Sequence, residues 1–139
     1  MLYFPQQKKL ETSICQKNLK NGLSKQAAYD FKTAEIMLEN KRFIYAVFMC
    51  HLSIEKALKG LYQSSLNELP PKVHNLIYPV EKIGLTPPDT FHNAIFELNR
   101  VSIPTRYPDD LTRMNKIYKK KGSSLFHVGS LNSSLPPMR

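Results

Sequence analysis

The stretch Arg42–Ser64 contains no proline, its only glycine is Gly60, and every residue from Phe43 to Cys50 is apolar. A helix with apolar side chains all round is usually buried at the centre of a protein. The period-two alternation of apolar and polar residues that is typical of strands is absent from the chain. The sequence therefore predicts an all-α protein, an up-and-down bundle of four to five helices around this central one.

Two further helices are expected, one before and one after the central helix in the sequence. Ser24 is a suitable N-cap for a first helix that ends near Asn40, and the apolar residues recur at the spacing of one helical face: Ala27, Phe31, Ala34 and Leu38. A short third helix is predicted over 73–83, where Pro79 shortens or kinks it and Gly84 ends it.

The last part of the chain adds two helices and a tail. Asp89 is a good N-cap for a fourth helix, which we expect Pro104 to stop. A final helix begins near Leu111 and loses its helical pattern after three lysines, Lys119–Lys121. Residues 122–139 are rich in Gly, Ser and Pro, so we expect an atypical disordered tail. One hypothesis for this tail is a frameshift in the lysine codons.

The size of the chain, 139 residues with 42% hydrophobic, predicts one globular domain, here 23–121. The net charge of +9 is not evenly distributed. The N-terminal extension 1–22 carries +3, residues 111–139 carry +6, and residues 23–110 are neutral. A phosphate-binding surface would therefore lie on the two ends of the chain. The alternative, which we favour at this point, is that basic ends merely aid solubility.

No membrane segment or signal peptide is expected, because no run approaches 18 apolar residues and the N-terminus lacks a basic start before an apolar stretch. We therefore expect a cytoplasmic chain. Its two cysteines, Cys15 and Cys50, are too few for a Cys-rich zinc site and are expected to be ordinary thiols, with Cys50 buried. The sequence indicates no metal and no cofactor.

Several segments of this chain, in the right order and spacing, resemble a HEPN domain. The segments are Gln26–Leu38, Lys41–Ala46, His51–Leu61, Pro71–Leu76, Leu98–Asn99 and Thr105–Asp110. The resemblance covers about residues 23–118. It implies a helical bundle, usually a homodimer, that occurs alone or beside a minimal nucleotidyltransferase in toxin and antitoxin pairs.

The resemblance also implies a possible chemistry, because several HEPN proteins are metal-independent endoribonucleases. They use an Arg and a His, separated by four to six residues at the start of a late helix, and two copies of this pair meet across the dimer. The guanidinium holds the scissile phosphate and the imidazole moves the proton of the ribose 2′-hydroxyl or of the leaving oxygen, which gives a cyclic phosphate.

This chain departs from that catalytic pattern. Downstream of Arg100, Arg106 and Arg113 the only histidine is His127, far outside the required spacing. Arg42 does not substitute, because eight residues separate it from His51. Ribonuclease activity of the usual family type is therefore not expected, since a general base must lie within reach of its proton.

The remaining polar residues give the candidate sites. His51, Glu55 and Lys59 are spaced at i, i+4 and i+8, so they share one helical face. They could line a groove for a nucleotide or RNA, or Glu55 and Lys59 could be a structural helix pair in which Glu55 also holds Arg106. We favour the structural interpretation. The catalytic candidates are Arg106, His74 and His51, and the candidate nucleotide- or RNA-binding residues are Arg106, Lys59, Glu55 and Asp109.

Two functions from different classes follow from the sequence. The first is a non-catalytic HEPN module, a homodimer that binds a nucleotidyltransferase partner and RNA or a nucleotide in a toxin-antitoxin or stress-response pair. The second is a metal-independent endoribonuclease with an unusual site built from Arg106, His74 or His51. The missing histidine and the neutral middle of the chain favour the first. A remnant without function is a third possibility.

Overall fold

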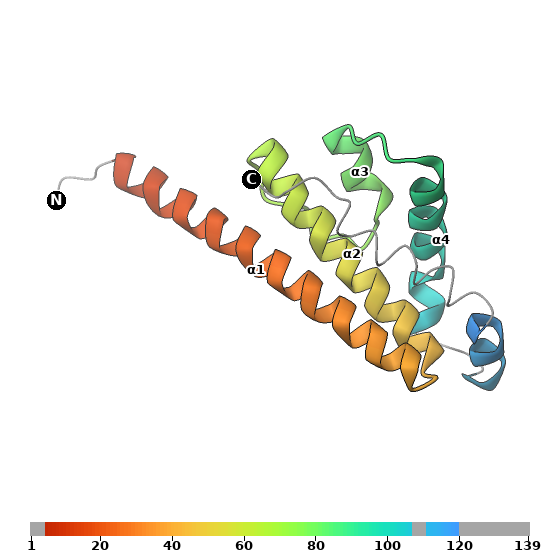
Figure 1. Cartoon of the computed structure of the whole chain (residues 1–139). Helices are drawn as coiled ribbons and strands as arrows, with labels where there is room; N and C mark the ends of the chain where they lie inside the picture. The colour runs from red at the N-terminus through yellow and green to blue at the C-terminus, as the bar shows by residue number, and fades with distance from the viewer. Residues whose placement is uncertain (1–4, 107–110, 120–139) are drawn as a thin grey trace.

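The computed structural model describes the backbone of residues 5–106 and 111–119, and the side chains of 21–102 and 111–119. Four helices follow one another along the chain, with a further helix over 111–119: α1 (Pro5–Glu39), α2 (Phe43–Leu66), α3 (Ile77–Ile83) and α4 (Asp89–Arg106). The described residues contain no strand. The two long helices α1 and α2 run antiparallel, and α3 and α4 cover the other side of α2 (Figure 1). The predicted all-α bundle is confirmed.

Small residues let α1 and α2 pack closely. Both helices contain short buried side chains: Ala27 and Ala34 in α1, and Ala46, Ser53 and Ala57 in α2. The Ser53 hydroxyl donates a hydrogen bond of 2.7 Å to the Ala27 carbonyl oxygen. Lys56 forms an ion pair with the buried Asp30 across the same interface. The pair α1–α2 is therefore fixed by polar contacts as well as by packing.

The apolar core surrounds much of α2, as the apolar character of this helix predicted, and it includes Ala34 of α1. Helix α2 contacts α1, α3 and α4. Ile54 and Leu58 of α2 are fully buried, together with Leu76 before α3 and Leu98 of α4. The same apolar cluster includes Tyr118, so the 111–119 helix also packs on the core. No described helix is long and apolar enough to cross a membrane.

The first helix starts much earlier than predicted. Ser24 is not an N-cap, because α1 begins at Pro5 and passes through Ser24 without interruption. Pro5 is compatible with a helix start, since the first turn has no use for its missing N–H. Gly22 costs only about 1 kcal/mol relative to alanine inside a helix, which does not stop a long helix. The basic extension predicted over 1–22 is thus helical from Pro5 onward.

The third helix is shorter than predicted and begins at Ile77, not at position 73. The Asn75 side-chain oxygen accepts hydrogen bonds from the backbone N–H groups of Ile77 and Tyr78 and so caps the first turn. Pro79 lies in that first turn, where its missing N–H costs nothing. Gly84 ends the helix as predicted, with a left-handed φ of 77° that favours glycine.

Pro104 does not stop the fourth helix, which continues to Arg106. Asp89, predicted as the N-cap, is the first residue of this helix, and the Pro88 carbonyl accepts the hydrogen bond from His92 N–H. A proline in the last turn removes a single hydrogen bond, to the carbonyl group four residues earlier, and this loss does not end the helix. The last helix is present over 111–119. Predictions for 107–110 and for the tail 122–139 lie outside the described residues.

Cys50 is a buried free thiol, as predicted, and burial raises its pKa to about 12. The thiolate is the form that reacts with alkylating agents. We therefore expect Cys50 to resist iodoacetamide at pH 8 in the native protein and to react fully in denaturant. Peptide mapping by mass spectrometry measures this directly. Alkylation of Cys50 in the native protein at the rate found in denaturant would contradict the buried position.

Candidate functional site

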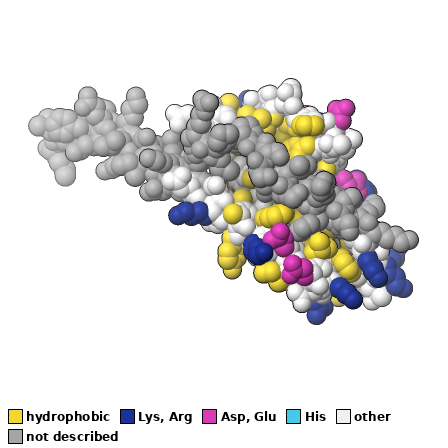
Figure 2. Space-filling view, in the orientation of Figure 1, with side chains coloured by type: hydrophobic (Ala, Val, Ile, Leu, Met, Phe, Trp, Pro, Cys, Tyr) yellow, Lys and Arg dark blue, Asp and Glu magenta, His cyan; other side chains and the backbone are white. Residues whose placement is uncertain are grey.

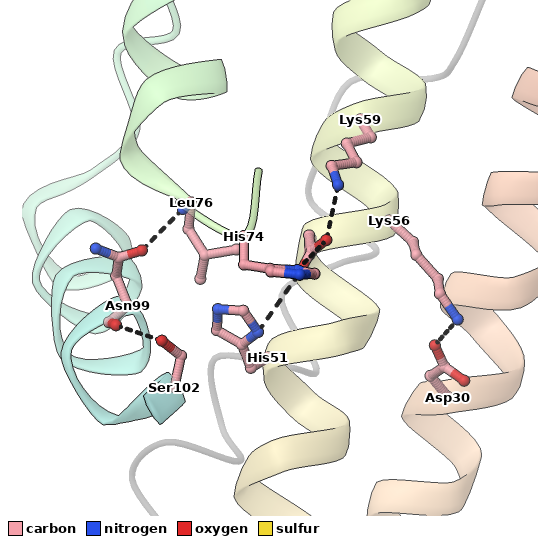
Figure 3. Close-up of polar contacts among 9 residues, drawn as sticks. Asp30, His51, Lys56, Lys59, His74, Leu76, Asn99 and Ser102 are labelled. Carbon is pink, nitrogen blue, oxygen red and sulfur yellow. Dashed lines mark hydrogen bonds and ion pairs between the residues drawn. The ribbon is translucent and has the colours of Figure 1, made fainter. Parts of the chain in front are cut away.

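A single carboxylate, Glu55, collects most of the polar groups that the sequence singled out. Lys59 donates a hydrogen bond of 2.8 Å from Nζ to Glu55 Oε1. The Nδ1 atom of His74 lies 3.1 Å from each of the two carboxylate oxygens. The Nδ1 atom of His51 lies 3.7 Å from Glu55 Oε2. Figure 3 shows that His51 and Lys59 come from α2, whereas His74 reaches the same point from the segment before α3.

These four residues, Glu55, Lys59, His74 and His51, form what we call the Glu55 cluster. Their burial differs: the side chain of His51 is 0% exposed, that of Glu55 8% and that of His74 62%. Burial acts to raise the pKa of Glu55, but the hydrogen bonds from Lys59 and His74 and their charges outweigh it, so this pKa is lowered. Glu55 is therefore an ionised carboxylate at neutral pH, held by cationic and polar partners.

The Glu55 cluster continues into a network that joins three parts of the bundle. Asn99 of α4 accepts a hydrogen bond of 2.9 Å from the backbone N–H of Leu76, two residues after His74. Ser102 of α4 in turn donates to the Asn99 carbonyl oxygen. Figure 3 shows both contacts to the left of His74. The segment between α2 and α3 is thus fixed to α2 through Glu55 and to α4 through Asn99.

The chemistry available to the Glu55 cluster is limited by these contacts. An imidazole that is held by a carboxylate through Nδ1 can move protons through Nε2, and the exposed His74 has this arrangement. His51 cannot reach a dissolved substrate in this conformation, because it is fully buried. Among the residues that the structure describes, no three His, Cys, Asp or Glu side chains are placed so that they could hold a metal ion.

The family model of the HEPN domain matches residues 21–123, most of the chain and nearly all of the described bundle. The chain belongs to the HEPN family. No match was found among curated proteins or among solved structures.

The HEPN bundle brings four of the predicted site residues together. His51, Glu55, Lys59 and His74 meet in the Glu55 cluster, although His74 is distant from the others in sequence. The side chain of Arg106 and the whole of Asp109 lie outside the described residues, so the expected contact between Arg106 and Glu55 stays a prediction.

Two polar contacts in this HEPN domain were missed by reasoning from sequence. Asn99 was noted only as part of the resemblance, and its bond to the Leu76 N–H depends on how α4 packs against the segment before α3. The contact between His74 and Glu55 crosses a loop and has no periodic signal in the sequence. The i, i+4 spacing of Glu55 and Lys59 did predict their ion pair.

Proposed function

We propose that this HEPN domain is a non-catalytic binding module that takes up RNA or a nucleotide and associates with a nucleotidyltransferase partner, in a toxin-antitoxin or stress-response pair. The observation that carries the non-catalytic part of the proposal is the geometry of the Glu55 cluster. Its carboxylate is buried and already bound to Lys59 and His74, and these contacts join α2 to the segment before α3. Such a cluster stabilises a fold more readily than it binds a phosphate.

Charge supports the absence of catalysis at the Glu55 cluster. A scissile phosphate needs cationic groups that are available to it. Lys59 is the cation nearest to His74 in this cluster, and it is neutralised by Glu55 at 2.8 Å. The carboxylate itself repels phosphate. The sequence also lacks the spacing of Arg and His that active members use.

Association with a second protein chain, as a homodimer and with a nucleotidyltransferase, is proposed from the family resemblance. Exposed apolar side chains supply area for such contacts, among them Tyr29 at 75% exposed and Ile36 at 47% on α1. Scattered apolar residues are normal on a protein surface. Tyr29 and Ile36 support a contact surface because both lie on the same long helix. Light scattering of the purified chain measures the oligomeric state.

A metal-independent ribonuclease is the second candidate, and one feature favours it. The imidazole of His74 is 62% exposed and is oriented by Glu55, which is the arrangement of a general base or acid. A cation would have to come from elsewhere, and Arg106 is the candidate from the sequence. This candidate predicts cleavage in EDTA with cyclic-phosphate ends.

We expect no cleavage when the folded protein is incubated with end-labelled structured and single-stranded RNA in EDTA. The physical reason is that Lys59, the cation of the Glu55 cluster, is paired with Glu55 and so is not available to stabilise the charge of the transition state. His74→Ala and Arg106→Ala serve as matched variants. Cleavage by the wild type that is lost in His74→Ala would overturn the proposal and make the protein an enzyme.

A further inference from the structure

The structure assembles a basic surface at one end of the bundle that the linear charge distribution does not reveal. The turn between α1 and α2 and the 111–119 helix lie at the same end of the molecule (Figure 1). Lys and Arg side chains gather at this end in the space-filling view (Figure 2). The exposed cations in these two segments are Lys41, Arg42, Arg113, Lys116 and Lys119, and we call them the basic end.

Local backbone geometry places the first two of these cations at the tip of a turn. Lys41 has a left-handed φ of 59°, and Arg42 follows it directly before α2 begins. The turn is closed by the backbone hydrogen bond of 2.8 Å from Arg42 N to the Met37 carbonyl oxygen. Both side chains are exposed. The two cations therefore project from a fixed turn.

The 111–119 helix presents its cations on one face because its other face is packed. Tyr118 is buried in the apolar core, and Met114 packs against the same core. Residues 114 and 118 are one turn apart and share a face. Arg113, Lys116 and Lys119 are exposed, and 111–119 contains no acidic residue. Packing of Tyr118 thus directs a cationic face toward solvent.

In the described part of the chain, few acidic residues lie beside the basic end in sequence. Glu39 is the nearest acid in sequence to the turn, and it lies two helical turns after Lys32, on the same face of α1. Glu97 of α4 is bound by Arg100. Neither the turn 40–42 nor the 111–119 helix contains an acidic residue. Within the described residues, the two segments of the basic end therefore carry five cations and no acid of their own.

An exposed aromatic ring favours nucleic acid over an acidic protein as the occupant. Tyr45 lies in the first turn of α2, three residues after Arg42, and is 53% exposed. Grooves for single-stranded nucleic acid combine cations for the phosphates with aromatic rings on which bases stack. The Glu55 cluster lies elsewhere, because Glu55 is about 20 Å along the α2 axis from Arg42 at 1.5 Å per residue.

We propose that the basic end binds the phosphate backbone of single-stranded RNA without sequence preference. This inference rests on the RNA-binding part of the proposed function and moves the site from Lys59 and Glu55, near the middle of α2, to the N-terminal end of α2. Phosphate contacts release counterions, so binding should weaken steeply with salt.

The test measures binding of a dye-labelled oligouridylate by fluorescence anisotropy at several salt concentrations. The variant Lys41→Gln/Lys116→Gln/Lys119→Gln removes three cations of the basic end. The control Lys25→Gln/Lys72→Gln/Lys82→Gln removes three exposed lysines elsewhere, with the same change in net charge. We expect the first variant to bind at least about tenfold more weakly, with a salt slope reduced by about 2, and the control to stay within about twofold of the wild type.

The possible failures are distinguishable. In one outcome the wild type binds RNA and both triple variants lose the same affinity. This result would contradict the basic end as the binding site, but RNA binding itself would remain supported. A larger loss of RNA affinity in the control variant would place the RNA-binding site at the Glu55 cluster instead, because the control includes Lys72, two residues before His74. Wild-type protein that binds no RNA would overturn both. Tighter binding of polyglutamate than of the RNA, lost in the first variant, would replace the RNA with an acidic protein.

Discussion

Glu55→Ala is expected to lower the free energy of unfolding by about 2–3 kcal/mol. The carboxylate of Glu55 is almost buried and is contacted by Lys59 and His74. Its removal leaves the Lys59 ammonium, only 18% exposed, without this partner. The side chain of Lys59 is long and can move toward water, so the cost falls below that of a fully buried broken pair. Urea denaturation followed by circular dichroism measures the change.

The pH dependence of stability provides a sharper test of the same site. The folded-state pKa of Glu55 is lowered, so the stabilisation that its carboxylate contributes is present above the unfolded pKa and is lost as pH falls through the folded pKa. The stability difference between wild type and Glu55→Gln should be constant above about pH 5. It should shrink progressively below the ordinary Glu pKa of about 4.3.

The matched control for Glu55 is Glu81→Ala, on the exposed surface of α3. Surface substitutions of this kind usually change stability by no more than about 0.5 kcal/mol. Equal effects of Glu55→Ala and Glu81→Ala would contradict the contacts of the Glu55 cluster. A difference between wild type and Glu55→Gln that persists unchanged at pH 3 would contradict the lowered pKa.

Leu58→Ala is expected to lower the free energy of unfolding by about 3–4 kcal/mol, the larger of the two effects. Leu58 is 0% exposed and belongs to the apolar core where α2 meets α3 and α4. Truncation removes buried methyl and methylene groups and leaves a cavity, because helices fixed by polar contacts collapse only partly into the space. Thermal denaturation should show a clear fall in Tm, and urea denaturation gives the free energy.

Leu52→Ala is the matched control for Leu58, since it makes the same chemical change on the half-exposed side of the same helix. The side chain of Leu52 loses less water-accessible area on folding than that of Leu58. Leu52→Ala should therefore lower the free energy of unfolding much less than Leu58→Ala. Comparable losses from the two variants would mean that α2 is not buried on the side that packs against α3 and α4.

Periodicity and composition predicted the helices because the pattern of apolar residues, including the apolar run of α2, can be recognised from the local sequence. An apolar run without breakers, such as Phe43–Cys50, is expected to be largely covered by neighbouring helices, and in the structure Tyr45 is the exposed exception. The ends of helices were harder to predict. Ser24 resembles a cap, but nothing before it forces the chain out of the helix, so α1 continues back to Pro5.

The candidate site could be predicted only where its residues lie on one helix. Spacing alone placed His51, Glu55 and Lys59 on a common face of α2, and the ion pair of Glu55 with Lys59 follows from it. The contribution of His74 could not be deduced, because a loop side chain has no period that relates it to a helix. The functional roles of these residues stay predictions.

The amino-acid sequence by itself determined that this protein is a helical bundle with the pattern of a HEPN domain, because hydrophobic periodicity is set by neighbouring residues along one chain. Tertiary structure alone decided that His74 meets Glu55, that Asn99 holds the backbone of Leu76, and that Lys41 and Arg42 share one end of the bundle with the 111–119 helix. These contacts join residues that are distant in sequence, and their geometry depends on how whole helices pack.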